Sequence, residues 1–224
     1  MRVDVTFVRV QTGAAADAPT LADLTDVELE SIQRLGMPAD RDRRATAYSA
    51  ARRTLARMLG MHPRRVPLMS TASGQPIVDR SRVGVSWSHS GCWVALAIAP
   101  EGAVGVDIER RPATLPMRAL RVLDLASIEE FVAREAAGKA TGQGLGERWP
   151  AGIVIRSLPA PEGYVAAVAA SGPTVSVHCG SVDNVRTWSH HARTISGSHI
   201  AAVNVWAYPE GISWGGSRLW LSRR

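Results

Sequence analysis

Three short apolar runs between residues 83 and 109 place the tightest limit on how this chain can fold. The runs cover residues 83–87, 93–99 and 103–108, are rich in Val, Ile, Ala and Trp, and are bounded by Gly, Pro or Ser. Runs of this length and composition are typical of buried β-strands. The sequence therefore predicts three consecutive strands that contribute to a hydrophobic core.

Two acidic residues stand at the end of the third predicted strand. Asp107 and Glu109 are two positions apart, so their side chains leave the strand on the same side. Neighbouring carboxylates repel each other unless a cation joins them, and a hard divalent ion such as Mg²⁺ suits such an oxygen pair. The same pair is also typical of a solvated strand end, which here leads into Arg110 and Arg111.

The composition indicates a globular protein that favours anionic partners. The 224 residues are 46% hydrophobic, enough for one good core or two small domains. A formal net charge of +6 favours nucleic acid, phosphorylated small molecules or an acidic protein surface, without choosing among them. Two cysteines far apart in the sequence, Cys92 and Cys179, predict a reducing, cytoplasmic location. The N-terminus lacks a signal peptide's apolar region, and no run reaches the ~18 apolar residues of a membrane span.

The remaining pattern predicts further strands and a short helix. Strands are expected at residues 2–10, 68–73, 152–158, 163–170 and 174–179. The last three strands follow one another like a meander, and residues 21–35 suggest a short helix. After residue 180 only a strand at 198–207 is suggested, and the adjacent His190 and His191 are interpreted as a surface pair.

Two predicted helices carry distinctive charge patterns. The helix at 40–59 has apolar residues at steps of three and four on one face. Its other face carries six arginines, typical of a solvated surface or of a cradle for phosphates: Arg41, Arg43, Arg44, Arg52, Arg53 and Arg57. The helix at 127–141 begins at a Ser127–Glu130 capping box. It places Glu135 and Lys139 on one face, a spacing that is also that of an ordinary surface ion pair.

Four motifs follow the basic helix in a fixed order. They are Gly74-x-Pro76, Ser88-His89-Ser90, Gly105-Val106-Asp107-Ile108-Glu109 and Phe131-x-x-Arg134-Glu135-Ala136-x-x-Lys139. In this order they resemble the motifs of the 4′-phosphopantetheinyl transferases of the Sfp type, over residues 41–170. Three positions depart from the family pattern: Gln75 and Arg134 replace lysines, and Phe131 replaces a tryptophan. The connector at 110–134 is also shorter than the family's, in which this segment helps to contact the carrier protein.

The resemblance implies an α/β (α+β) fold with a pseudo-twofold arrangement of two similar halves in one chain. Each half would be a small, mostly antiparallel sheet with packed helices, and coenzyme A would lie between the halves. The expected division is an N-terminal half over 1–100, a C-terminal half over 101–180, and a Trp-rich tail over 181–224.

The activity implied by the resemblance is a Mg²⁺-dependent transfer. The 4′-phosphopantetheine arm of coenzyme A would pass to a serine of an acyl or peptidyl carrier protein, releasing 3′,5′-ADP. Asp107, Glu109 and Glu135 would hold the metal, and Glu135 and Lys139 would be the catalytic pair. The coenzyme A site would comprise Arg44, Gly74, Gln75, Pro76, Ser88, His89 and Lys139.

The partners expected from the resemblance are coenzyme A and a carrier protein, with no nucleic acid and no membrane, and the protein is expected to be a monomer. Two alternatives stay open. One is a degenerate homologue that binds coenzyme A or a carrier protein without turnover, suggested by Gln75 and the short connector. The other is a non-enzymatic protein that binds nucleic acid through the arginine helix.

Overall fold

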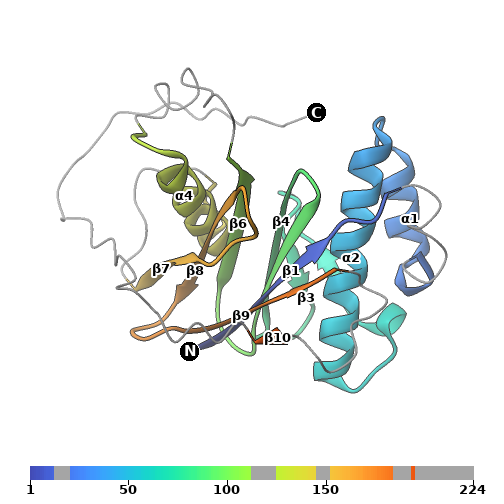
Figure 1. The fold of residues 1–224 in the computed structure, drawn as a ribbon. Helices are drawn as coiled ribbons and strands as arrows, with labels where there is room; N and C mark the ends of the chain where they lie inside the picture. Colours follow the sequence, from blue (N-terminus) through green and yellow to red (C-terminus); the bar gives the residue numbers. More distant parts are fainter. Residues whose placement is uncertain (13–20, 112–124, 145–151, 184–192, 195–224) are drawn as a thin grey trace.

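A computed structural model describes residues 1–12, 21–111, 125–144, 152–183 and 193–194 of the chain. In these residues two sheets stand side by side, and helices cover the outer face of each (Figure 1). Small, largely antiparallel sheets with packed helices confirm the expected α/β (α+β) class. The twofold relation between the halves and the division at residues 100 and 180 stay predictions.

The larger sheet has five strands in the order β10-β9-β1-β5-β4. Their bounds are β1 Arg2–Arg9, β4 Gly84–Ser90, β5 Trp93–Ala99, β9 Ser176–Val182 and β10 Arg193–Thr194. The central strand β1 pairs antiparallel with β5 and parallel with β9. Two helices cover one face of this sheet: α1 (Asp26–Gln33) and α2 (Pro38–Leu59).

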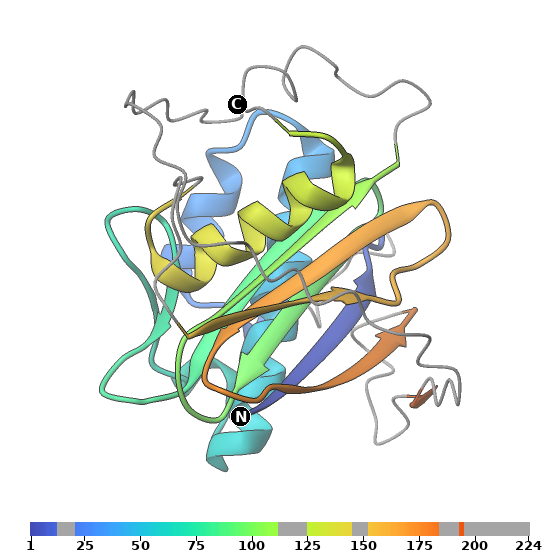
Figure 2. The same ribbon diagram turned by 90° about the vertical axis from the view of Figure 1, so that its left-hand side faces the viewer.

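The smaller sheet has three strands in the order β6-β8-β7, all antiparallel. Their bounds are β6 Val104–Arg110, β7 Ile153–Leu158 and β8 Tyr164–Ser171. Helix α4 (Ile128–Thr141) lies across the outer face of this sheet (Figure 2). A separate hairpin of β2 (Leu68–Ser70) and β3 (Pro76–Val78) follows the short 3-10 helix η3 (Pro63–Arg65).

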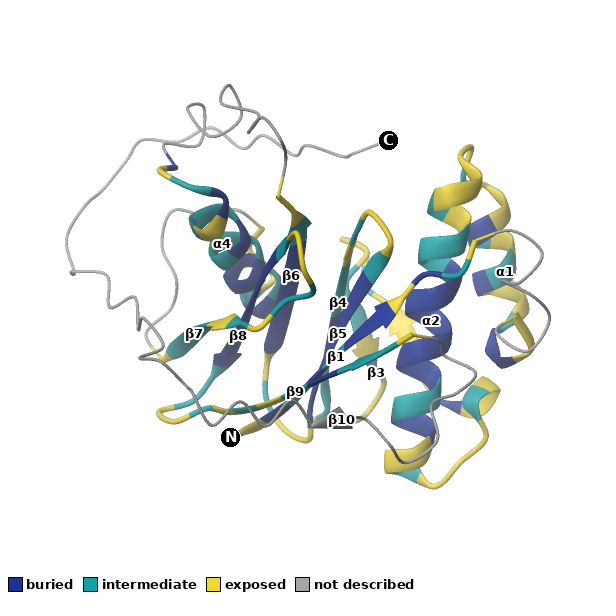
Figure 3. Ribbon diagram, viewed as in Figure 1, coloured by how far each residue is buried: buried dark blue, intermediate teal, exposed yellow. Residues whose placement is uncertain are grey.

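Three apolar clusters hold these layers together, because the central strands bury side chains on both faces (Figure 3). On β1, Val3, Val5 and Phe7 face the smaller sheet, whereas Val8 faces α1 and α2. A third cluster joins α4 to the far face of the smaller sheet, around Val132. The molecule is thus a helix–sheet–sheet–helix stack in which β4 and β6 are neighbours.

The arginine face of α2 is neither uniformly solvated nor uniformly available to a ligand. Arg52 is 2% exposed, and its Nε pairs with the carboxylate of Glu28 at 2.7 Å. Its Nη1 also donates to the carbonyl oxygens of Pro63 and Val66. Arg53 pairs with Asp23, which lies in the short 3-10 helix η2 (Leu21–Asp23). These two arginines therefore stabilise the fold, and the candidates for phosphate binding lie nearer the start of the helix.

One expectation about strand order is wrong, and one predicted helix starts later than expected. The strand predicted at 174–179 does not continue a meander. After β8 the chain leaves the smaller sheet, and β9 pairs with β1 in the larger one. The helix predicted at 21–35 is divided into η2 and α1, because Thr25 forms a capping box with Glu28 and starts a new helix.

Other predictions agree with the structure or lie outside its described part. The strand predicted at 68–73 ends at Ser70, and the helix predicted at 40–59 begins at Pro38. The predicted strand at 198–207, the His190–His191 pair and most of the tail lie outside the described residues. No helix in the described part of the chain combines the length and apolar character that crossing a membrane requires.

Candidate active site

Strands β4 and β6 face each other across the junction of the two sheets, and serine side chains join them. We call Ser86, Ser88 and Ser90 the serine ladder, because they alternate along β4 and all bond to β6. The Oγ of Ser86 accepts the N–H of Val106 at 3.1 Å, and the Oγ of Ser90 accepts the N–H of Arg110 at 3.0 Å. Hydroxyl groups thus satisfy backbone donors on the outer edge of β6, which pairs with no strand in the described residues.

The two candidate metal carboxylates lie on the side of β6 that faces the serine ladder. The Oγ of Ser88 donates to Oδ1 of Asp107 at 2.6 Å, and the Oγ of Ser90 donates to Oε2 of Glu109 at 3.0 Å. Both carboxylates therefore leave the strand on the same side, as their two-residue spacing predicts. Asp107 is only 3% exposed, so its charge is held in the protein interior.

Lys139 of α4 provides a positive partner for Asp107. Its Nζ donates to Oδ1 of Asp107 at 2.7 Å and to the carbonyl oxygen of Val106 at 3.2 Å. The other oxygen of the carboxylate, Oδ2, is buried without a hydrogen-bond partner among the described residues. A buried carboxylate oxygen with no donor is costly, which is the condition that a cation or a ligand proton would relieve.

The approach of α4 to β6 depends on Gly105. A Cβ atom at this position would overlap the carbonyl oxygen of Ala136 and lie 2.9 Å from the Cβ of Lys139. Only glycine therefore permits the helix to pack this closely on the strand. The glycine two residues before Asp107 is thus what brings Lys139 within reach of the carboxylate.

Three basic side chains lie within electrostatic range of His89, and together with His89 we call them the cationic group: Arg43, Arg44, His89 and Lys139. The imidazole of His89 is exposed, but protein crowds its other sides, and this partial desolvation is the main cause that lowers its pKa. Repulsion from Arg43, and to a smaller extent from Arg44 and Lys139, lowers the pKa further, against a backbone hydrogen bond that raises it. Arg43 and Arg44 of α2 and Lys139 of α4 are therefore all close enough to His89 of β4 to affect its pKa. Such a concentration of basic side chains is expected where a polyanion binds.

The arginines of the cationic group are held by local contacts. Arg43 pairs with Asp40 and donates from Nη1 to the carbonyl oxygen of Gly91 at 3.2 Å. The guanidinium carbon of Arg44 lies 6.0 Å from the ring centroid of Tyr48, which itself packs edge-on against Trp87. These contacts hold Arg43 at the end of β4 and Arg44 beside the aromatic pair that packs on the middle of that strand.

The Gly74-x-Pro76 motif forms the turn between β2 and β3, and this turn contacts the end of α4. Gly74 has a positive φ of 82°, and Pro76 is the first residue of β3. The side-chain Nε2 of Gln75 donates to the carbonyl oxygen of Lys139 at 3.0 Å. Gln75 therefore stands against the last turn of α4 and contacts protein at the position where the family pattern has a cation.

The structure brings most predicted site residues to one junction, but its described residues form no cluster of three acids close enough to hold a metal. Glu135 lies one helical turn before Lys139 and is half-buried. Within the ranges that the structure describes, no three acidic, His or Cys side chains lie close enough to hold a metal. Asp107 and Glu109 nevertheless suit a hard cation, since both offer carboxylate oxygens and Oδ2 of Asp107 is buried with no donor from the described part of the chain.

Sequence reasoning missed Ser86, Ser90 and the contact of Gln75. The signal for the serines was their alternation, Ser-x-Ser-x-Ser, at the end of a buried strand, where hydroxyls on one side would face a neighbouring element. No signal in the sequence indicated that the Gln75 amide would meet a helix terminus 64 residues away.

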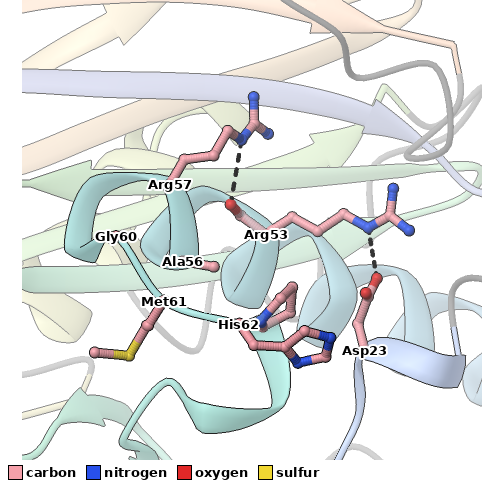
Figure 4. A pocket seen from close by; sticks show the side chains of 8 residues that line it. Asp23, Arg53, Ala56, Arg57, Gly60, Met61 and His62 are labelled. Atoms are coloured by element: carbon pink, nitrogen blue, oxygen red, sulfur yellow. Dashed lines mark hydrogen bonds and ion pairs between the residues drawn. The ribbon is translucent and has the colours of Figure 1, made fainter.

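A pocket of about 570 Å³ lies at the other end of α2 (Figure 4). Its lining includes Asp23, Arg53, Arg57 and His62, and the Nε of Arg57 donates to the carbonyl oxygen of Arg53 at 3.2 Å. Burial, followed by repulsion from Arg53, lowers the pKa of Arg57. Arg57 follows Arg44 by thirteen residue steps, a rise of about 20 Å along the helix, so this pocket is separate from the junction.

This mixed α/β protein with a buried carboxylate–lysine pair is similar to a known protein over part of its length. No model of a known protein family matches the chain. Over 112 residues, 47% of this chain, it is 33% identical to a protein of Thraustochytrium sp. named phosphopantetheinyl transferase. The matched part is 39% of that protein, so the chain spans well under half of its relative's length.

Proposed function

We propose that the protein transfers the 4′-phosphopantetheine arm of coenzyme A to a serine of an acyl or peptidyl carrier protein, as a transferase of the Sfp type. The similarity to a protein named phosphopantetheinyl transferase supports this class of reaction. The observation that carries the proposal is the buried Asp107, held between Ser88 and Lys139 beside the cationic group. Few purely structural surfaces would retain a half-satisfied carboxylate next to several positive side chains.

Coenzyme A would bind through its phosphates. It carries a 3′-phosphate and a diphosphate, and the cationic group offers Arg44, His89 and Lys139 to these charges. The serine ladder and the Gly74–Pro76 turn border the same junction. Lys139 is the residue best placed to hold the diphosphate, because its ammonium already lies at the buried acid.

Asp107 and Glu109, with Glu135 as third acid, would hold Mg²⁺, which when bound would neutralise charge on the diphosphate of the leaving 3′,5′-ADP. In the transfer, the serine oxygen of the carrier forms a bond to the phosphorus of the arm, and the bond to 3′,5′-ADP breaks. Glu135 would accept the serine proton. The rate enhancement would come mainly from fixed charges around the phosphates.

The test is incubation of the full chain with coenzyme A, Mg²⁺ and a panel of apo acyl and peptidyl carrier proteins, followed by intact-protein mass spectrometry. The proposal expects a mass gain of one phosphopantetheine arm on a carrier serine. Coenzyme A binding with no arm on any carrier would instead identify a degenerate binder. Steeply salt-dependent nucleic-acid binding with no affinity for coenzyme A would identify the non-enzymatic alternative.

A further inference from the structure

The side chain of Gln75 joins the two halves of the site. It projects from the turn between β2 and β3, which belongs to the first half of the chain. Its Nε2 donates to the carbonyl oxygen of Lys139 at 3.0 Å, on the last turn of α4. The turn itself is held by two bonds between Gln75 and Thr71, so the amide is presented from a fixed backbone.

The end of α4 needs such a donor. The last four carbonyl groups of a helix lack partners within the helix, and the carbonyl of Lys139 is one of them. Gly142 caps the helix with a φ of 72°, and a Cβ there would lie 3.4 Å from Oε1 of Gln75. The carboxamide therefore packs directly over the helix end, as well as bonding to it.

Lys139 is consequently held at both ends. Gln75 binds its backbone carbonyl, while its ammonium binds Asp107 and the carbonyl of Val106. The carbonyl that Gln75 holds and the ammonium that binds Asp107 belong to the same residue. A shift of the last turn of α4 would therefore move the ammonium relative to the buried acid. The contact of Gln75 is thus mechanically linked to the centre of the site.

We infer that Gln75 is a positioning residue: its amide clamps the β2–β3 turn to the end of α4 and so keeps Lys139 at Asp107. The functional part of this inference rests on the proposed function, in which Lys139 meets the diphosphate of coenzyme A. The clamp also explains how a neutral residue can occupy this turn, since it acts through the helix and not on the ligand.

The clamp is tested first without any ligand, by hydrogen exchange of the amides in residues 136–144. Gln75→Met removes the donor at similar volume and is expected to speed exchange there about threefold to tenfold, the equivalent of one hydrogen bond. Gln143→Met is the matched control, because Gln143 is an exposed glutamine next to the same helix end whose side chain makes no hydrogen bond to a described residue. Unchanged exchange in Gln75→Met, or equal changes in both variants, would overturn the clamp. Unchanged exchange in β8 would show that Gln75→Met is folded.

The route of action is tested by coenzyme A binding, measured calorimetrically. Gln75→Met is expected to weaken binding about threefold to tenfold in the wild-type background and to have no further effect in Lys139→Met. An equal loss in both backgrounds would mean that Gln75 contacts the ligand itself, and would overturn the positioning role. If wild-type protein bound no coenzyme A, the proposed function would fail while the hydrogen-exchange test of the clamp remained decisive.

Discussion

At the scale of single residues, the site is built around one carboxylate that the fold only half satisfies. Oδ1 of Asp107 accepts from both Ser88 and Lys139, whereas Oδ2 is buried without a donor among the described residues. Burying a charge is costly unless it is paired and fully hydrogen-bonded. The Asp107–Lys139 pair therefore lowers stability relative to apolar residues of similar volume. That the chain nevertheless has this pair favours a functional role for it.

The first prediction concerns this pair. Lys139→Met should lower the free energy of unfolding by about 1–3 kcal/mol, because it leaves the Asp107 carboxylate buried without its positive partner. The double variant Asp107→Asn/Lys139→Met should recover most of that loss, since no buried charge remains. Urea denaturation measures both values, and a double variant no more stable than Lys139→Met would show that the two side chains are not coupled.

His89 yields a prediction about pH. Its pKa is lowered in the folded protein, so the unfolded state binds a proton more readily than the folded state does. Stability should therefore fall as the pH drops through the ordinary histidine range near about 6.5, and His89→Gln should lose this part of the pH dependence. Denaturation of both proteins between about pH 7.5 and 5.5 measures the difference.

An NMR titration of the same imidazole tests the cause. Arg43→Met should raise the pKa of His89, because it removes the charge whose repulsion lowers that pKa most. Arg34→Met, on exposed surface and paired with Glu30, is the control and should leave the titration unchanged. A pKa of His89 that does not respond to Arg43 would remove the electrostatic evidence for the cationic group.

At the scale of elements, a single glycine and three serines determine how α4, β6 and β4 fit together. Gly105→Ala should cost about 1–3 kcal/mol or more, because its methyl group would collide with the backbone of α4. Gly36→Ala is the matched control, since a Cβ there meets no atom within 4 Å. Thermal and urea denaturation of both variants compare them, and equal stabilities would contradict the tight packing of α4 on β6.

The serine ladder should show a gradient of effects. Ser86→Ala leaves the buried N–H of Val106 without its acceptor and should cost about 1–3 kcal/mol. Ser90→Ala should cost less, because the N–H of Arg110 lies where water can replace the hydroxyl. Ser70→Ala, an exposed serine of β2, should be neutral. The opposite order in denaturation experiments would mean that the ladder does not support the junction.

The elements also show which parts of the fold a sequence pattern can predict. The strand at Trp93–Ala99 and the start of α4 after Ser127 were predicted because apolar runs and caps are local signals. The pairing of β9 with β1 was not predicted. An alternating pattern identifies a strand, but it does not say which of two sheet edges that strand will join. For the site, spacing placed Asp107 and Glu109 together, whereas the Gln75 contact depends on tertiary packing.

At the scale of the whole molecule, two sheets with outer helices meet at β4 and β6, and most of the candidate residues lie at that junction. Neither sheet alone would hold them, since Ser88 and His89 come from the larger sheet and Asp107 and Glu109 from the smaller one. α2 and α4 add positive charge from either side. The arrangement suits a ligand with several phosphates that touches both halves at once.

The most direct measurement is the mass of an apo carrier protein after incubation with coenzyme A, Mg²⁺ and either wild type or Asp107→Asn. Asn keeps the shape of Asp107 without its charge, and Asp79→Asn, in an exposed ion pair with Arg80, is the control. The account predicts transfer of the phosphopantetheine arm by wild type and by Asp79→Asn, and none by a folded Asp107→Asn. Transfer by Asp107→Asn at the wild-type rate would contradict it.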